Sequence, residues 1–338
     1  MILITGGAGY VGSVLTRKLL ELGERVRIFD KFYFGEESLW DVRNKVEIIK
    51  GDIREFDPKA LNGVTAVVHL AALSTDPQAE YNPEATLQIN TVATENLASM
   101  VKKRKIGRFI FASSASVYYT TTREEIATIK NEQMSVFPTV PYAKSKYVAE
   151  QKLLRMTGDG FCPVILRKGT IFGVSPRMRY DLVVNTFVRD AFSGGRLYVN
   201  AGGEAFRPLV HINDAVEAYI ALLLASEEKV RGEVFNLVHK NYWVLSLAHW
   251  VKYVLREKKQ IEVDVSYQGQ DGVRSYYVSG EKMSKTMGFC PAVGINKGVL
   301  ELWERLEKNE LADFQNEKYY NIKQMEKLIA EKKIGREL

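Results

Sequence analysis

Residues 1–12 have the sequence "MILITGGAGYVG", and this stretch decides the fold. Its apolar start predicts a buried strand that leads directly into a glycine-rich turn. Gly6, Gly9 and Gly12 are three residues apart, and Gly7, Gly9 and Gly12 also fit the pattern G-x-G-x-x-G. A chain that turns sharply, approaches a ligand and starts a helix against a sheet has little room for a Cβ atom at these points. The stretch therefore predicts a strand–turn–helix unit whose helix N-terminus binds a pyrophosphate.

The next two strand patterns end in carboxylates. Asp30 ends "RVRIFD", eighteen residues after Gly12. A carboxylate at this place accepts hydrogen bonds from both ribose hydroxyls and repels a 2′-phosphate, so it favours NAD over NADP. Its neighbour Lys31 is a cation that would tolerate such a phosphate. The motif "GDIR" follows the third strand pattern and places Asp52 and Ile53 where they can hold an adenine edge.

Strand and helix patterns alternate over the first 170 residues. Short apolar strands separated by helix-length segments predict βαβ units and a parallel sheet that is covered on both faces. We expect an α/β fold with a Rossmann-type doubly wound parallel sheet and a smaller C-terminal substrate-binding lobe. The predicted NAD-binding domain covers residues 1–172, with a helix and a strand returning to it at about 213–238. The predicted substrate-binding lobe comprises 173–212 and 239–317, and a charged helical tail follows at 318–338.

A second motif carries acid/base chemistry. The strand pattern "RFIFASSASVYY" contains Ser114, and the helix pattern "PYAKSK" places Tyr142 and Lys146 four residues apart, on one face of a helix. A tyrosine is a poor base at neutral pH, but an ammonium group one turn away stabilises its phenolate and lowers its pKa. A serine hydroxyl can hold the substrate's oxygen beside the phenol. We therefore interpret Tyr142, Lys146 and Ser114 as catalytic residues.

Composition narrows the classes of partner. The net charge is +6, but Lys and Arg are dispersed and the densest run, residues 102–105, resembles an exposed helix end. We therefore expect a small anionic substrate and no nucleic acid. No run reaches 18 apolar residues and the first strand leaves no room for a signal peptide, so we expect no membrane partner and a cytoplasmic protein. Four unpaired histidines argue against a metal site, and Cys162 and Cys290 are expected to be reduced thiols.

These motifs together resemble a known family over nearly the whole chain. They are "TGGAGYVG", "GDIR", "HLAAL", "FASSASVY", "YAKSK" and "RPLVHINDA". The chain resembles the extended short-chain dehydrogenase/reductase family, in its NAD-dependent epimerase/dehydratase group acting on nucleotide sugars, and in particular the UDP-glucose 4-epimerase-like members. The resemblance implies NAD as cofactor, Tyr142 as acid/base, Lys146 as its partner and Ser114 as the hydroxyl that positions the sugar. The expected cofactor-binding residues are Gly6, Gly9, Tyr10, Val11, Gly12, Asp30, Asp52, Ile53, Leu70, Ala71, Ala72, Asn90, Tyr142 and Lys146.

The resemblance also implies the partners. The substrate is expected to be a UDP- or dTDP-linked sugar, with Asn185 on a phosphate and Arg207 on the diphosphate. The expected substrate-binding residues are Ser74, Ser116, Thr170, Asn185, Arg207, Arg274 and Tyr276. Many family members pair two long helices per subunit in a four-helix bundle. Here residues 85–104 and 142–155 would form that bundle, which predicts a homodimer.

Departures from the family pattern bear on the reaction. The 4,6-dehydratases carry Asp-Glu directly after the catalytic hydroxyl residue, and decarboxylating relatives usually keep the glutamate, whereas this chain has Ala115 and Ser116. The missing carboxylate disfavours both reactions and leaves 4-epimerisation through a transient 4-keto sugar as the leading prediction. Tyr119 stands where glycine is usual, Thr170 where asparagine is usual, and Lys168 where an uncharged residue is commoner.

Other functions stay open at this point. An NAD(P)-dependent 4-ketoreductase would use the same residues once per turnover, with an exchanging cofactor. A 4,6-dehydratase is the less favoured nucleotide-sugar reaction. An oxidoreductase on a neutral substrate, such as a sterol or flavonoid, is opposed by Asn185 and Arg207. A non-catalytic, NAD-sensing Rossmann protein would tend to lose the tyrosine, whereas this chain keeps Ser114, Tyr142 and Lys146.

Overall fold

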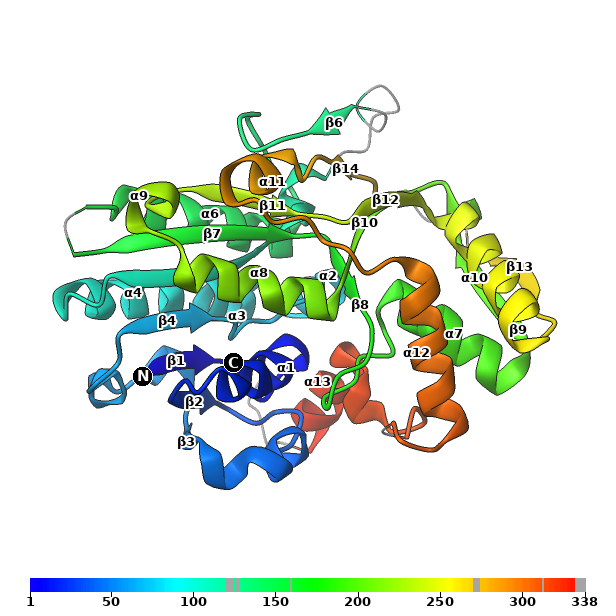
Figure 1. Cartoon of the computed structure of the whole chain (residues 1–338), viewed down its shortest axis with the longest axis horizontal. Helices are drawn as coiled ribbons and strands as arrows, with labels where there is room; N and C mark the ends of the chain where they lie inside the picture. The colour runs from blue at the N-terminus through cyan, green and yellow to red at the C-terminus, as the bar shows by residue number, and fades with distance from the viewer. Residues whose placement is uncertain (120–124, 126–127, 159, 270–273, 312, 332–338) are drawn as a thin grey trace.

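A seven-stranded parallel sheet forms the centre of the larger lobe (Figure 1). The computed structural model describes residues 1–338 except 120–124, 126–127, 159, 270–273, 312 and 332–338. The strand order is β11-β7-β5-β4-β1-β2-β3, so the chain adds strands first on one side of β1 and then on the other. This is the order of doubly wound Rossmann sheets, which confirms the predicted fold class. The strands are β1 (Ile2–Thr5), β2 (Val26–Asp30), β3 (Glu47–Lys50), β4 (Ala66–His69), β5 (Arg108–Ser114), β7 (Cys162–Lys168) and β11 (Val234–Leu237).

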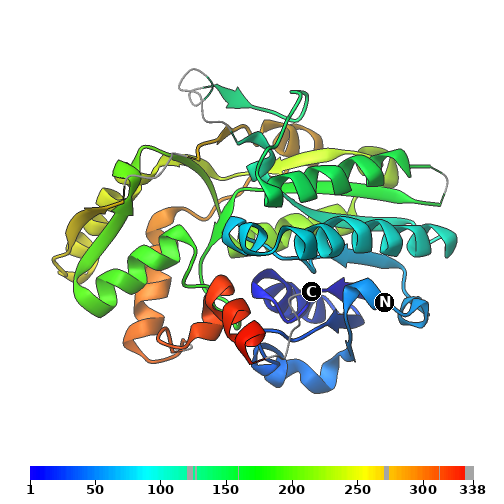
Figure 2. The ribbon, with the colours of Figure 1, turned by 180° about the vertical axis from the view of Figure 1, so that it is seen from behind.

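Helices cover both faces of this sheet. Helices α1 (Tyr10–Glu21) and α8 (Ile212–Leu224) lie on one face, and α4 (Ala93–Lys103) and α6 (Pro141–Arg155) lie on the other (Figures 1 and 2). Because side chains alternate along a strand, neighbouring residues of β1 enter different cores. Ile4 packs in the core under α1 and α8, and Leu3 packs in the core under α4 and α6. Both residues are fully buried, so the sheet supports the site from two sides.

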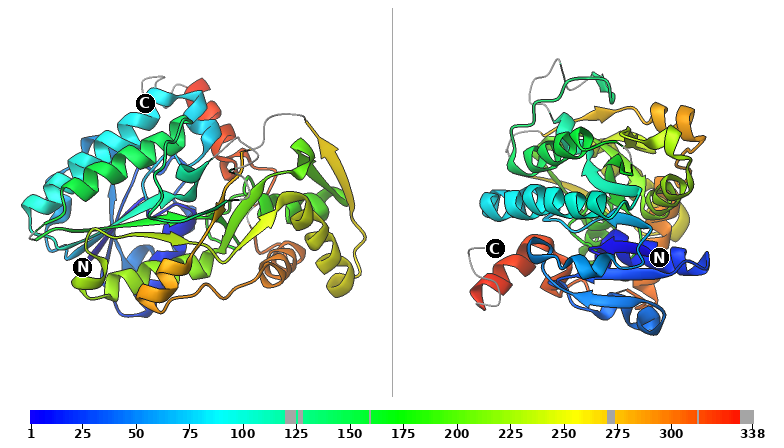
Figure 3. Two further views of the ribbon diagram at one scale, coloured as in Figure 1. Left: turned by 90° about the horizontal axis from the view of Figure 1, so that it is seen from above. Right: turned by 90° about the vertical axis from the view of Figure 1, so that its left-hand side faces the viewer.

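A smaller lobe lies at the end toward which the strands of the sheet run (Figures 1 and 3). Its apolar core contains side chains from three helices, among them Phe187, Leu247 and Leu302. The helices are α7 (Val183–Gly194), α10 (Val244–Lys259) and α12 (Ile295–Glu307). The strands are β8 (Thr170–Phe172), β10 (Phe206–His211) and β12 (Lys240–Trp243) in one sheet, and β9 (Arg196–Asn200) and β13 (Asp264–Gln268) in another.

Several late segments return to the larger lobe. Strand β11 pairs with β7, and helix α11 (Glu281–Met287) packs against β11 with Met283 in the core under α1 and α8. Helix α13 (Asn321–Ala330) places Met325 in the core of the opposite face. The residue ranges drawn from the sequence for the two lobes stay a prediction. The remaining elements are α2 (Asp76–Tyr81), α3 (Pro83–Leu87), α9 (Glu227–Val230), and the paired β6 (Ile129–Lys130) and β14 (Tyr277–Val278).

In the described part of the chain, we find no helix with the length and apolar character needed to cross a membrane.

Candidate active site

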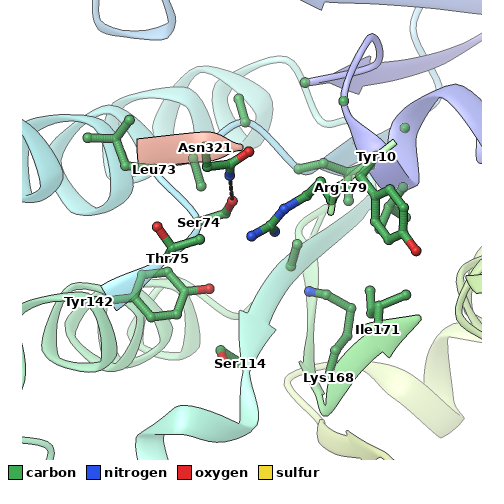
Figure 4. Close-up of a pocket in the computed structure, with 18 of the residues that line it drawn as sticks. Tyr10, Leu73, Ser74, Thr75, Ser114, Tyr142, Lys168, Ile171, Arg179 and Asn321 are labelled. Carbon is green, nitrogen blue, oxygen red and sulfur yellow. Dashed lines mark hydrogen bonds between the residues drawn. The ribbon is translucent and has the colours of Figure 1, made fainter. Parts of the chain in front are cut away.

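A cavity of about 530 Å³ lies between the C-terminal ends of the sheet strands and the smaller lobe. Its walls come from the turn after β1, the loops that follow β2, β4 and β5, the start of α6, and segments of the smaller lobe. The open side of a doubly wound sheet is where such folds bind ligands, so the cavity stands where the sequence motifs require it. Figure 4 shows Tyr142, Lys168 and Arg179 pointing into the same space from different elements.

The glycine turn is a cradle that side chains would fill. Gly6 has φ +73°, and a Cβ on Gly12 would lie 2.3 Å from the carbonyl oxygen of Gly6. Helix α1 begins after Gly9, and no side chain caps its first N–H groups. These groups and the helix dipole are therefore available to an anion. The geometry fits the pyrophosphate of NAD.

The ribose end of the cavity is fixed by Asp30. Its two carboxylate oxygens accept hydrogen bonds from the backbone N–H groups of Ala8 (2.9 Å) and Phe32 (2.8 Å). The neighbouring Lys31 is turned aside, because its amine binds Asp52 at 3.0 Å. Burial acts to raise the pKa of Asp52, but hydrogen bonds from Arg54 and Lys31 hold that pKa well below its ordinary value. Asp52 is therefore ionised at neutral pH and binds Lys31 at the cavity wall.

Most of the other expected cofactor contacts also lie on the cavity: Gly6, Gly9, Tyr10, Val11, Gly12, Ile53, Leu70, Ala71 and Ala72. Asn90 does not. Its amide accepts from the backbone N–H of Leu73 and donates to the carbonyl of Leu73 and the hydroxyl of Ser145. With these partners Asn90 is fully buried beneath the wall, where it positions Leu73, and its expected contact with the cofactor stays a prediction.

Tyr142 and Ser114 meet at the reacting end of the cavity. Tyr142 lies in the first turn of α6, after Pro141, and Ser114 ends β5. Burial raises the pKa of Tyr142 above its ordinary value, and a hydrogen bond with Ser114 acts to lower it. The Ser114 oxygen also accepts from the backbone N–H of Ser116 at 3.1 Å, which fixes its position. The hydroxyl and the phenol can therefore hold one substrate oxygen together.

Lys146 is buried one turn along the same helix. Its side chain is 2% exposed, and its Nζ lies 4.8 Å from the ring centre of Phe111. Burial lowers the pKa of Lys146 to about 7, although the charge of Glu150 acts to raise it. The sequence assigned to Lys146 the stabilisation of the Tyr142 phenolate. Without a ligand, Ser114 and then Arg179 are the main groups that act to lower the pKa of Tyr142.

Two arginines and a tyrosine line the cavity on the side where we expected the diphosphate of the substrate. The guanidinium of Arg207 donates to the carbonyls of Phe206 (2.9 Å) and Arg274, and it lies 5.3 Å from the ring centre of Tyr276. Arg274 forms ion pairs with Asp76 (3.3 Å) and Glu80, and so connects the smaller lobe to α2. The remaining expected substrate contacts on the cavity are Ser74, Ser116 and Thr170.

The side chain of Asn185 is hydrogen-bonded within the protein. Its side-chain oxygen accepts from the N–H of Gly173 at 3.0 Å, and its amide donates to the hydroxyl of Tyr10 and the carbonyl of Arg179. Asn185 is 1% exposed and is not on the cavity wall. It lies within helix α7, whereas Asp181 and Leu182, just before the helix, line the cavity. Asn185 therefore holds the loop below the site in place, and its expected contact with a phosphate stays a prediction.

Sequence reasoning missed a second group of cavity residues. Arg179 forms two hydrogen bonds of 2.9 Å with Asp181, and Arg177 stacks on Phe34 with 3.9 Å between its guanidinium carbon and the ring centre. The charged cluster "RMRYD" at residues 177–181 is a sequence signal for these side chains, and Lys168 stands out in the sequence only as a departure from the family pattern. Asn321, at the start of α13, had no sequence signal at all.

The two residues that follow Ser114 are not the acidic pair that 4,6-dehydratases carry at this place. Ala115 and Ser116 are buried and lack an acidic group. Asp76 lines the cavity, where burial raises its pKa and the charge of Arg274 acts to lower it. One oxygen of Asp76 binds Arg274, and the other is buried without a hydrogen-bond partner in the described structure.

Comparisons with known proteins agree with this geometry. The model of the NAD dependent epimerase/dehydratase family matches residues 2–237. UDP-glucuronic acid decarboxylase 1 of Xenopus tropicalis is 28% identical over 306 residues, which are 88% of this chain and 70% of that protein. UDP-glucose 4-epimerase of Mus musculus is 25% identical over 342 residues, covering 91% of this chain and 97% of that protein.

A solved structure has the same fold. UDP-glucuronic acid 4-epimerase from Bacillus cereus, in complex with UDP-glucuronic acid and NAD, superposes with a TM-score of 0.78 at 21% identity. The match covers 91% of this chain and 99% of that one. At this identity the similarity concerns the fold, including the lobe that closes the cavity.

Proposed function

Since this chain belongs to the NAD-dependent epimerase/dehydratase family, we propose that it is a nucleotide-sugar 4-epimerase. The family's members are enzymes, and NAD is the cofactor. An epimerase and a decarboxylase are similarly close in sequence, so the relatives define the class of enzyme and not the reaction. The choice of epimerisation comes from this chain's own residues.

Tyr142 is the proposed acid/base. Its phenolate takes the proton from the sugar C4 hydroxyl, while Ser114 holds the same oxygen by a hydrogen bond. Bound NAD supplies the hydride acceptor for C4. Lys146 has a pKa of about 7, so it carries a charge in part of the molecules at neutral pH, and the charged form stabilises the phenolate. Tyr142 then returns the proton after the 4-keto sugar has turned its other face.

The residues proposed to hold the diphosphate leave the sugar free to rotate. Arg207 and Tyr276 would hold the diphosphate at the smaller lobe, away from Tyr142, so the sugar can rotate about its link to the phosphate. Arg274 is held by Asp76 and Glu80 on α2 in the absence of substrate. A diphosphate that attracts Arg274 would therefore act on the contact between the two lobes.

The absence of an elimination carboxylate at Ala115 and Ser116 is the observation that carries the proposal. Loss of water from C6 needs a proton donor and a proton acceptor besides Tyr142. Epimerisation needs only the group that serves the C4 oxygen. Hydride returns to its source in each turnover, so the cofactor undergoes no net change.

Product analysis in deuterium oxide tests the reaction. UDP-glucose, UDP-glucuronic acid and dTDP-glucose are incubated with the NAD-loaded enzyme, and products are identified by NMR. We expect a 4-epimer from at least one of them, without net NADH and without deuterium on carbon. Deuterium at C5 or C6 with loss of water would indicate a dehydratase, a pentose product would indicate a decarboxylase, and NADH consumption on a 4-keto sugar would indicate a ketoreductase.

The homodimer remains part of the proposal. Helices α4 and α6 lie side by side on the surface of the larger lobe (Figure 3), joined by an ion pair between Lys152 and Glu95. Nearby Tyr81 and Leu87 are 50% and 42% exposed, so this face offers apolar area to a second copy. Gel filtration with light scattering measures the mass of the particle. The cytoplasmic location also stays a prediction.

A further inference from the structure

Lys168 places an amine at the reacting end of the cavity. It ends β7, where its backbone is paired with Ser114 of β5. Its Nζ donates to the carbonyl of Ser113 at 2.8 Å and lies 5.9 Å from the ring centre of Tyr219. Figure 4 shows the amine pointing into the space between Tyr142 and Arg179. With one hydrogen bond to the described residues, the amine keeps donor capacity for a ligand.

The charge of Lys168 has no acidic partner among the described residues. Its neighbours differ in this respect, since Arg179 is bound by both oxygens of Asp181. Burial, and then the charge of Lys146, lowers the pKa of Lys168 well below its ordinary value. A buried amine without a carboxylate is unfavourable in the charged form, and an anion that enters the cavity would restore the charge and bind it strongly.

The position of Lys168 identifies which anion it would meet. The glycine turn after β1 is suited to the pyrophosphate of NAD, and Arg207 is the proposed contact of the substrate diphosphate. Lys168 is paired with Ser114 on the neighbouring strand, and Figure 4 shows its amine pointing into the space that Tyr142 also faces, where the sugar would react. We infer that Lys168 recognises a carboxylate on the sugar, so that the substrate is a nucleotide-linked uronic acid; this inference rests on the proposed function.

A matched pair of ligands tests the inference. UDP-glucuronic acid and UDP-glucose differ only in a carboxylate or a hydroxymethyl group at C5. Calorimetry on the NAD-loaded protein is expected to show at least ~10-fold tighter binding of UDP-glucuronic acid, the scale of one hydrogen bond to a charged group. Lys168→Met is expected to abolish this preference and to leave UDP-glucose binding within about twofold. The control Lys144→Met removes an exposed lysine of α6 and is expected to keep the preference.

The outcomes separate two failures. If UDP-glucose binds as tightly as UDP-glucuronic acid, or if the preference survives in Lys168→Met, the inference is wrong and the proposed function stands. If neither the UDP pair nor the corresponding dTDP pair binds, the proposed function fails, and the inference fails with it. A circular-dichroism melt of Lys168→Met shows whether the variant is folded, and Lys168→Gln repeats the measurement with a polar side chain.

A different set of contacts concerns the C-terminal segment. Residues 317–325, here called the clasp, contain the first turns of α13, and Asn321 and Ile322 of this segment line the cavity. Asn321 is 3% exposed. Its amide donates to the hydroxyl of Ser74 at 3.0 Å, and its side-chain oxygen accepts from Arg177 at 2.6 Å. One residue thus connects the loop after β4 to the segment that precedes α7.

The clasp also reaches the loop after β2. Gln324 donates to the carbonyl of Tyr33 at 2.9 Å, and Lys318 forms a 2.9 Å ion pair with Glu37. The backbone N–H of Asn321 donates to Asp181 at 3.3 Å. Three segments that border the cofactor end of the cavity are therefore tied together by one stretch of chain.

We propose that the clasp retains NAD between turnovers. Asn321 is buried, so releasing the clasp breaks several buried or partly buried hydrogen bonds at once, which makes opening slow. A retained cofactor suits a reaction that restores NAD in each cycle. It would hinder a reaction that must exchange NADH for NAD after every turnover.

The rate of cofactor release tests the clasp. Protein loaded with NADH is mixed with excess NAD, and the loss of bound-NADH fluorescence is followed in time. Asn321→Ala is expected to raise the release rate at least ~10-fold, because it removes the three side-chain hydrogen bonds of Asn321, to Ser74, Gln78 and Arg177. The control Lys327→Ala, on the exposed side of α13, is expected to leave the rate unchanged.

A second variant guards against loss of fold in Asn321→Ala. The double substitution Gln324→Ala with Lys318→Ala removes partly exposed contacts to Tyr33 and Glu37 and leaves Asn321 in place. It is expected to release NADH faster than wild type. Wild-type release rates in folded Asn321→Ala and in the double variant would overturn the proposal, whatever reaction the enzyme performs.

Discussion

The two ends of the cavity are built in different ways. At the cofactor end, the Gly6–Gly12 turn and the loop of Leu70–Ala72 directly follow neighbouring strands, Asp30 ends the strand β2, and backbone N–H groups fix the Asp30 carboxylate. At the substrate end, Arg207 and Arg274 come from distant parts of the chain and are held by carbonyls and ion pairs. The cofactor end is thus a rigid cradle, whereas the substrate end consists of charged side chains whose partners a ligand can replace.

This difference has a physical consequence. The glycine turn leaves no room for a side chain, because a Cβ at Gly12 would lie 2.3 Å from the carbonyl oxygen of Gly6, so substitutions in this turn should weaken the binding of NAD. An ion pair such as Arg274–Asp76 can be exchanged for an interaction with a diphosphate at modest cost, because both states satisfy the charge. We therefore expect substitutions at the two ends to weaken the binding of different ligands. Substitutions at the reacting centre between them should lower only the rate of the reaction.

Substitution of the reacting centre is expected to have the largest effect. Tyr142→Phe should retain NAD and nucleotide-sugar binding and lose at least ~10²-fold in kcat, because the C4 oxygen loses its acid/base. Steady-state kinetics with calorimetry of both ligands measures the effect, and the exposed-ring control Tyr253→Phe should behave as wild type. Near-normal turnover in Tyr142→Phe would show that another group moves the proton.

The substrate end comes next. Arg207→Ala should weaken binding of UDP by about 2 kcal/mol, or about thirtyfold, because a partly buried charge on the diphosphate is lost. NAD affinity should change little, since NAD would contact the opposite end. Calorimetry with each ligand measures both, and the exposed Arg196→Ala serves as control. If UDP binding is unaffected, the diphosphate does not lie at Arg207, and the nucleotide-sugar proposal loses its main support.

Asp30 should have a smaller effect, confined to the cofactor end. Asp30→Asn keeps a side-chain acceptor but loses the charge, so NAD should bind about tenfold more weakly and the gap to NADP should narrow. Fluorescence titration with NADH and NADPH measures both affinities. Lys31→Ala should change little, because the Lys31 amine is occupied by Asp52. Equal affinity of the wild type for NADH and NADPH would contradict the assignment of Asp30.

The smallest expected effect concerns stability and pH. Lys146 has a folded pKa of about 7 and an ordinary value near 10.5, so between these values the unfolded chain binds a proton that the folded chain does not. Uptake of this proton on unfolding lowers the folding stability at pH 7, and this loss of stability disappears as the pH rises toward 10.5. Lys146→Met should therefore stabilise the NAD-free protein at pH 7 by on the order of 1–3 kcal/mol and flatten the rise in stability with pH.

Urea unfolding at pH 7 and pH 9.5 measures this effect, with the exposed Lys144→Met as control. The same Lys146→Met protein should lose activity, because the charged amine supports the phenolate. A variant that is less stable than wild type at pH 7 would show that Lys146 is charged in the folded protein. It would then contribute to folding through Glu150, whose charge acts on its pKa.

The cofactor end was largely predictable from the sequence. The glycine turn follows β1, Asp30 ends β2 and the "HLAAL" motif begins at the last residue of β4, and the carboxyl ends of parallel strands meet at one edge. Local sequence therefore implied the spatial arrangement. Tyr142 and Lys146 were predictable for the same reason, since one helix turn joins them.

The sequence was less informative where a position depends on packing between distant segments. Asn90 and Asn185 are polar residues in promising motifs, yet each is consumed by backbone groups below the cavity wall. Helix periodicity cannot distinguish an amide that faces a ligand from one that fastens a loop. The interaction of Lys31 with Asp52 was also hidden from the sequence, because two neighbouring strands bring together residues 21 positions apart.

The sequence alone determined the doubly wound sheet, the NAD cradle and the pair Tyr142 and Lys146, because strand periodicity, glycine spacing and helix spacing are local properties of the chain. Only the tertiary structure placed the Lys168 amine, which has no carboxylate partner in the described part of the chain, on the same cavity as Tyr142, and laid Asn321 across the cofactor end. These placements depend on which charges lack a partner after folding and on where α13 packs. Both are decided by the sum of long-range contacts, which no short stretch of sequence contains.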